Sequence, residues 1–217
     1  MKIPYCSVLI VVTIISGPAL TRAEERPLPA DCTYEMQVWN VNQRSSTHTK
    51  KVQHPYVDVT SAETDYDTGC TVCSEDQVLV EVPPLQPFFV CYGLSSRVRT
   101  VIQDLMRSGA QLYTVIGYRV IKSRGPVNGN GDRTEFSNHS FGTAIDINPE
   151  QNGLYDNCVA FGPRCRLIRG GEWKLGVSGT LDRNSAIVTM FKLAGFKWGG
   201  EIAGKQKDFM HFSMTGY

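Results

Sequence analysis

The chain has 217 residues, a formal net charge of +1 and no extended run of lysine or arginine. This charge balance argues against a nucleic-acid-binding surface of the usual strongly basic kind. Apolar residues make up 41% and charged residues 20% of the chain, which is ordinary for a globular protein with a buried core. The length fits one medium domain with an extension, or two small domains.

The first 23 residues have the three-part pattern of a secretory signal peptide. Lys2 supplies a positive charge, residues 8–15 form a short apolar run, and Thr21-Arg22-Ala23 places small residues where signal peptidase reads the chain. The apolar run is too short to span a bilayer comfortably, although an uncleaved membrane anchor is the alternative interpretation. We therefore expect a secreted or periplasmic monomer with no stable membrane insertion after cleavage.

Cysteines support export. Cleavage of the signal peptide removes Cys6 and leaves an even set, namely Cys32, Cys70, Cys73, Cys91, Cys158 and Cys165. An even number of cysteines in an exported chain indicates disulfides. Cys158 and Cys165 flank a turn-rich segment and are predicted to pair, whereas the other four allow three connectivities. The C-x-x-C at Cys70 and Cys73 could instead be a redox pair or half of a zinc knuckle, but no second such motif accompanies it.

Residues 24–90 are predicted to form an N-terminal, disulfide-containing extension of unknown role. Alternating valines at 78–82 indicate a strand, which Pro83-Pro84 ends. The proline-rich stretch 83–87 is the expected boundary with the domain that follows.

Residues 91–217 show clearer periodicity and are predicted to form the second domain. Apolar residues recur at helical spacing between Val98 and Met106, which predicts an amphipathic helix at about 95–109. The further expected elements, in chain order, are a strand at 112–121, a polar loop at 123–134, a strand at 143–148, a helix at 185–194 and strands at 196–198 and 209–214. Because helices and strands mix without strict alternation, the predicted fold class is α+β, with a mixed, largely antiparallel sheet flanked by helices.

Two of the four histidines lie in unusual settings. Asp146 stands between two isoleucines in an apolar strand, where a lone carboxylate is costly to bury unless it is paired or bound to a metal. His139 lies just upstream, and Gly142 lets the backbone bend between them. His211 lies in a second apolar run, shortly after Asp208.

Two histidines and one carboxylate from separate strands are typical of a three-ligand zinc site whose fourth position is open to water. We therefore predict that His139, Asp146 and His211 hold one Zn²⁺ and that Asp208 is the general base. The alternatives are that His211 is an ordinary core residue and that Asp146 caps a turn.

The motifs resemble a known family. The pattern S-x-H-x6-D at 137–146, followed by D-x-x-H at 208–211, is similar to that of the zinc metallopeptidases that include D-alanyl-D-alanine carboxypeptidases, D-Ala-D-Ala dipeptidases and phage L-alanyl-D-glutamate endolysins. Trp198-Gly199-Gly200 resembles the residues ahead of the family's second motif. The resemblance covers roughly 95–217, and it implies the fold that these peptidases share with hedgehog signalling domains.

The resemblance also implies a function. We expect residues 91–217 to be the catalytic domain of a secreted zinc metallopeptidase that hydrolyses peptide bonds in peptidoglycan stem peptides, of the D-Ala-D-Ala carboxypeptidase or L-Ala-D-Glu endopeptidase type. Family members use an arginine to stabilise the charge that develops on the scissile carbonyl. Gly117-Tyr118-Arg119 is similar to the G-Y-R of several members, so Arg119 is the expected residue and Arg124 the alternative.

Two other function classes compete with this one. A zinc-containing binding module of the same fold would keep the ligands but lack hydrolytic activity. A disulfide-stabilised interaction protein would bind no metal and would leave the buried Asp146 unexplained.

Overall fold

The computed structural model describes residues 26–216, so the predicted signal peptide lies outside the described residues. In this part of the chain two α-helices and five 3-10 helices accompany strands in four sheets. The strand pair β1–β6 is parallel and the remaining pairs are antiparallel. The predicted α+β class with a largely antiparallel sheet is therefore confirmed. No helix in the described range has the length and apolar character needed to cross a bilayer.

The central sheet has the order β11-β13-β8-β5 and carries the two motifs. Its strands are β5 (Val115–Ile116), β8 (Ala144–Ile147), β11 (Lys197–Trp198) and β13 (His211–Ser213). The strands predicted at 143–148 and 196–198 thus form, each slightly shorter than expected, whereas the strand predicted at 209–214 forms over three residues only.

The strand predicted at 112–121 is wrong in its extent, because β5 covers two residues only. Beyond it the chain leaves the central sheet. The Tyr118 amide donates to the Phe89 carbonyl at 2.7 Å, and the Arg119 amide donates to the His139 carbonyl at 3.2 Å. These bonds to other parts of the chain replace the ladder that a continuous strand would need.

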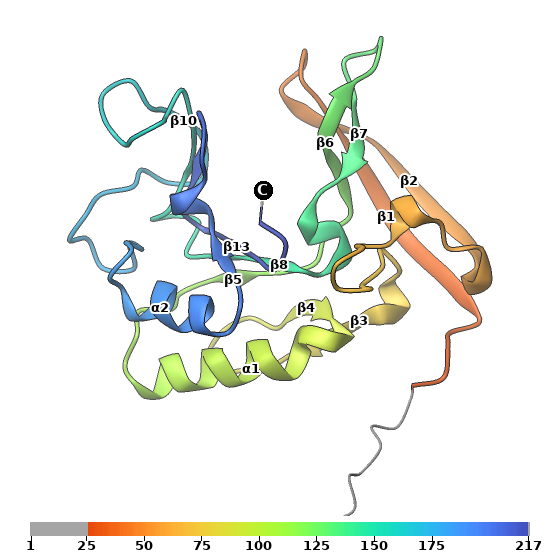
Figure 1. Cartoon of the computed structure of the whole chain (residues 1–217), viewed down its shortest axis with the longest axis horizontal. Helices are drawn as coiled ribbons and strands as arrows, with labels where there is room; N and C mark the ends of the chain where they lie inside the picture. Colours follow the sequence, from red (N-terminus) through yellow and green to blue (C-terminus); the bar gives the residue numbers. More distant parts are fainter. Residues whose placement is uncertain (1–25, 217) are drawn as a thin grey trace, which may run out of the picture.

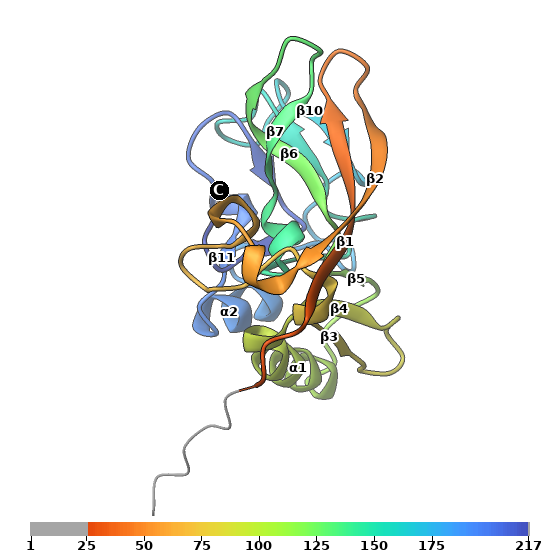
Figure 2. The same cartoon turned by 90° about the vertical axis from the view of Figure 1, so that its right-hand side faces the viewer.

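A second sheet, β2-β1-β6-β7, forms one arm of the molecule (Figure 1). Its strands are β1 (Asp31–Asn40), β2 (Ser45–Pro55), β6 (Ile121–Val127) and β7 (Arg133–Phe136). Figures 1 and 2 show two hairpins, β1–β2 and β6–β7, lying side by side, and in Figure 1 they rise from the level of β8 and β13.

The loop predicted at 123–134 is wrong, since most of it is the β6–β7 hairpin. Pro126 fits here because the register between the two strands shifts between Arg124 and Val127, the interval that contains it. The turn itself is confined to a few residues, where the Asn128 side-chain oxygen accepts from the amides of Asn130 and Asp132 at 2.9 Å. The glycine and proline content that suggested a loop therefore marks an irregular hairpin.

The third sheet, β10-β9-β12, forms the opposite arm (Figure 1). It contains β9 (Leu154–Asp156), β10 (Arg166–Arg169) and β12 (Lys207–Asp208). The predicted disulfide between Cys158 and Cys165 is confirmed and closes the connection between β9 and β10.

The helices lie beneath these sheets (Figures 1 and 2). The first, α1 (Tyr92–Arg107), confirms the amphipathic helix but begins before the predicted start. The second, α2 (Ala186–Leu193), has Ser185 as its N-cap. The buried face of α1 consists of Leu94, Val98, Val101, Ile102 and Leu105, and burial of each such side chain stabilises the fold by about 1.5–3 kcal/mol.

The N-terminal segment is tied to this body. Strands β3 (Gln77–Val80) and β4 (Phe88–Cys91) pair with each other and precede α1. The two remaining disulfides join Cys32 to Cys73 and Cys70 to Cys91, which settles the connectivity that the sequence leaves open. The short helices of this segment are η1 (Tyr56–Asp58), η2 (Ser61–Glu63) and η3 (Ser74–Asp76).

Candidate metal centre

His139 is positioned by a short helix that ends at a glycine. The helix η4 (Asn138–Phe141) stops at Gly142, whose φ of 66° lies in the left-handed region. A Cβ at Gly142 would lie 2.4 Å from the backbone nitrogen of Cys91, so both the conformation and the space require glycine. This turn carries the chain from His139 directly into β8, and His139 is 3% exposed.

Asp146 and His211 are brought together by strand register. They are direct partners across the antiparallel pair of β8 and β13, and partners of this kind project to the same face of a sheet. Asp146 is 4% and His211 6% exposed. Two motifs far apart in the sequence thus meet because two short strands pair.

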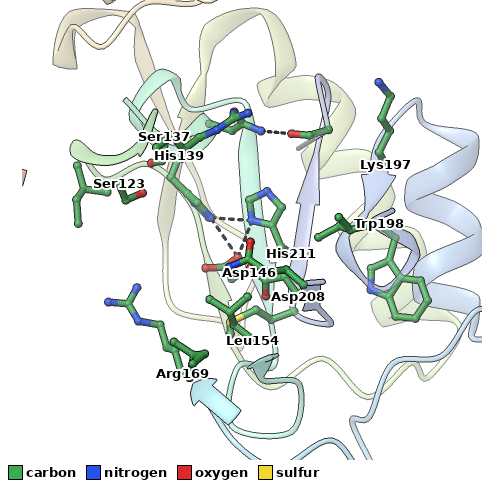
Figure 3. A pocket seen from close by; sticks show the side chains of 18 of the residues that line it. Ser123, Ser137, His139, Asp146, Leu154, Arg169, Lys197, Trp198, Asp208 and His211 are labelled. Atoms are coloured by element: carbon green, nitrogen blue, oxygen red, sulfur yellow. Dashed lines mark hydrogen bonds and ion pairs between the residues drawn. The ribbon is translucent and has the colours of Figure 1, made fainter. Parts of the chain in front are cut away.

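Three atoms of these side chains form a triangle. His139 Nε2, Asp146 Oδ1 and His211 Nδ1 lie 3.1 Å from one another (Figure 3). Ligand atoms at about 2.0–2.1 Å from a tetrahedral zinc ion are separated by about 3.3 Å. The observed spacing is close to this value. Two imidazoles and a carboxylate are also ligands that zinc accepts, so the residues present fit a metal of this kind.

The outer nitrogen of His139 supports the same role. Its Nδ1 lies 2.9 Å from the Gly117 carbonyl oxygen. A proton on Nδ1 would donate to that oxygen and leave the Nε2 lone pair directed at the triangle, as in most metal-ligating histidines. The other tautomer would accept at Nδ1 from Arg119, whose Nη1 is also 2.9 Å away. A metal at Nε2 selects the first arrangement.

The protonation states also suit a metal. Burial lowers the pKa of His139 to about 4, assisted by the nearby Arg119 cation. Burial alone would raise the pKa of Asp146, but the interactions with His139, His211 and Arg119 outweigh it and hold that pKa well below its usual range. At neutral pH the site therefore presents a neutral imidazole and an ionised carboxylate, the forms that bind metal.

Arg119 contacts two of the three predicted ligands. Besides its approach to His139, its Nη2 donates to Asp146 Oδ2 at 2.8 Å. The side chain is 36% exposed and lines the cavity above the triangle. A guanidinium has five N–H donors, so Arg119 can hold Asp146 and still face the cavity. The alternative residue, Arg124, also lines the cavity and donates to the Asn138 side-chain oxygen.

Asp208 lies at the end of β12 in the wall of the same cavity (Figure 3). The residue is 9% exposed and is not one of the three clustered ligand atoms. The Trp198-Gly199-Gly200 motif packs against the backbone of Asp208 and Phe209. Trp198 Nε1 donates to the Phe209 carbonyl at 2.8 Å, and a Cβ at Gly199 would lie 2.2 Å from the Asp208 carbonyl oxygen. Trp198, 5% exposed, both packs in the core and borders the cavity.

The cavity has a volume of about 1150 Å³ and extends well beyond the triangle. Its walls come from both arms: Trp39 of β1 and Ser123 of β6 on one side, Leu154 of β9 and Arg169 of β10 on the other. Sequence reasoning missed Trp39 and Arg169. Neither lies in a recognisable motif, and only the pairing of β1 with β6 and of β9 with β10 places them here.

Comparison with known proteins identifies one family. Residues 130–214 match the family model described as D-alanyl-D-alanine carboxypeptidase. This match confirms the resemblance predicted from the two motifs and supports a metallopeptidase of the carboxypeptidase kind. It contains η4, β8 and β13 and leaves β1, β2, α1 and β6 outside. No curated protein and no solved structure matches the chain.

Proposed function

We propose that the protein is a secreted zinc metallopeptidase that hydrolyses peptide bonds in peptidoglycan stem peptides. The observation that carries the proposal is the triangle of His139, Asp146 and His211, with Asp208 in the wall of the same cavity. The family match supports a peptidase of this kind, while zinc, the stem-peptide substrate and export are proposals.

In this proposal the three triangle residues hold Zn²⁺, which when bound supplies Lewis-acid activation of water and of the scissile carbonyl group. Asp208 accepts the proton of the attacking water and returns it to the leaving amine. Arg119, fixed by Asp146, places its remaining N–H donors near the oxygen of the scissile carbonyl and stabilises the negative charge that develops there. Arg124 is the alternative for this last role.

Export is proposed from the predicted signal peptide and is compatible with three disulfides. We further propose that residues 91–217 are the catalytic domain and that the preceding segment, 24–90, is an extension whose strand β1 reaches the cavity through Trp39. The substrate is a peptide, with no nucleic acid involved, and the active form is a monomer.

The experiment is digestion of purified stem peptides, with the products identified by mass spectrometry. Zinc-loaded protein should release defined fragments, a chelator should abolish the reaction, and Asp208→Ala should bind zinc without turnover. The rival is a zinc-containing binding module of the same fold. A zinc-loaded wild type that binds stem peptides but cleaves none of them would favour that rival, and wild-type turnover by Asp208→Ala would refute the assignment of the base.

A further inference from the structure

The cavity carries more positive charge than the proposed chemistry uses. Its lining includes seven arginines and lysines against three carboxylates. Two of these cations are paired, Arg119 with Asp146 and Lys192 with Glu201. The other five have no carboxylate within 4.0 Å in the described part of the chain, namely Arg124, Arg133, Arg169, Lys197 and Lys205. A cleft lined by one sign of charge attracts ligands of the opposite sign.

Among these five cations, Arg169 lies beside the metal centre on a side that the structure defines. It is the last residue of β10 and is exposed. Figure 3 shows its side chain extending from β10 toward the side of the cavity where Ser123 of β6 lies, whereas Lys197 lies on the opposite side of the triangle. Arg169 therefore stands beside the metal centre on one particular flank.

Trp39 of β1 reaches the same flank from the other arm. The Arg169 guanidinium lies over the Trp39 ring, 6.0 Å from its centroid, at the outer limit for a cation–π contact. The contact joins the two arms across the cavity. The contact leaves the guanidinium without a carboxylate partner in the described part of the chain, so its N–H donors can bind a ligand.

We propose that Arg169, positioned by Trp39, binds a carboxylate of the substrate next to the scissile bond. The inference rests on the proposed peptidase function and extends it, since it assigns an acidic class of substrate to this flank. A guanidinium suits the role because it holds a carboxylate through two parallel N–H···O bonds. Trp39 lies outside the family match and Arg169 inside it, so the proposed subsite joins a residue of the matched range to one of the N-terminal segment.

The carboxylate can come from an acidic side chain or from the C-terminus of the peptide. One set of substrates separates these sources: a stem peptide with both groups free, its side-chain amide and its C-terminal amide. Arg169→Gln removes the charge and Arg169→Lys retains it. Arg183→Gln removes the same charge from an exposed position outside the cavity and serves as the control.

The readout is kcat/KM for each enzyme on each substrate. We expect wild type to prefer the free acid over one of the amides about three- to tenfold, as one partly solvated ion pair allows. The preference should disappear in Arg169→Gln, persist in Arg183→Gln, return in part in Arg169→Lys, and shrink at high salt. An equal loss on all three substrates would show a structural role and overturn the proposal, as would an unchanged preference in Arg169→Gln.

The proposal can be tested separately from hydrolysis. If zinc-loaded protein cleaves none of the peptides, the proposed function fails, but fluorescence anisotropy with labelled versions of the same three peptides still measures the preference. A three- to tenfold difference in Kd that Arg169→Gln abolishes would support the subsite. The same Kd for all three peptides would overturn it.

Discussion

Gly199→Ala tests whether the position of Asp208 matters for catalysis. The added Cβ would lie 2.2 Å from the Asp208 carbonyl oxygen and 3.1 Å from its Cβ, whereas ordinary contact begins at 3.4 Å. The backbone of β12 must therefore move by about 1.2 Å. A misplacement of about 1 Å can cost about a hundredfold in rate, so we expect kcat to fall by about that factor. Overpacking should also cost about 1–3 kcal/mol of stability.

The assay combines kcat on a cleaved stem peptide, zinc content and thermal unfolding. Zinc content should stay at the wild-type value, because the substitution touches none of the three ligand side chains. Gly93→Ala is the matched control, since it adds the same methyl group in the first turn of α1, where nothing lies within 4 Å. It should retain activity and lose no stability. Wild-type kcat in Gly199→Ala would refute the argument that the tryptophan–glycine motif positions the base.

Further expectations concern the base, a buried acid and the disulfides. Asp208→Asn should lower kcat by about 10²–10⁴-fold with zinc binding intact; a smaller loss measured by steady-state kinetics would argue against the general base. Burial alone would raise the pKa of Glu63, but hydrogen bonds from Tyr34, Thr60 and His54 outweigh it and lower the pKa to about 2. This carboxylate therefore stabilises the fold fully above its ordinary pKa of 4.5, and the contribution is lost as pH falls toward 2. In urea titrations, the stability difference between wild type and Glu63→Gln should shrink across that interval, and a difference independent of pH would contradict the reasoning. Replacing Cys32 and Cys73 by serine should lower the free energy of unfolding by about 4 kcal/mol, because this disulfide joins residues 41 positions apart. Replacing Cys158 and Cys165, which are 7 positions apart, should lower it by about 2.5 kcal/mol. Equal losses in denaturant unfolding would contradict this ranking.

The sequence predicted the parts of the fold that rest on local pattern. The helix at 95–109 and the strand at 143–148 have clear periodicity and both form. The prediction failed where long-range contacts decide. A strand expected at 112–121 breaks after β5 because Tyr118 bonds to Phe89 instead of the sheet. The segment 123–134 forms a hairpin because it finds a partner in the β1 arm.

Some residues of the candidate site could be predicted from the sequence, and others are revealed only by long-range strand pairing. His139, Asp146 and His211 could be selected from the sequence because a histidine or carboxylate in an apolar setting needs a partner, and the structure places their ligand atoms together. Arg119 was selected only by resemblance, and its contact with Asp146 Oδ2 follows from the break in the strand that precedes it. Trp39 and Arg169 had no signal, since strand pairing alone brings them into the cavity.

Zinc titration of the purified protein, with and without each triangle residue, shows whether these three side chains share one metal ion. We expect one zinc ion per chain in wild type and a loss of affinity of about a hundredfold or more in each of His139→Ala, Asp146→Ala and His211→Ala. His54→Ala, a histidine that contacts Glu63 and lies outside the triangle, should bind zinc as wild type does. Zinc binding that survives unchanged in any of the three triangle variants would contradict shared coordination by these side chains.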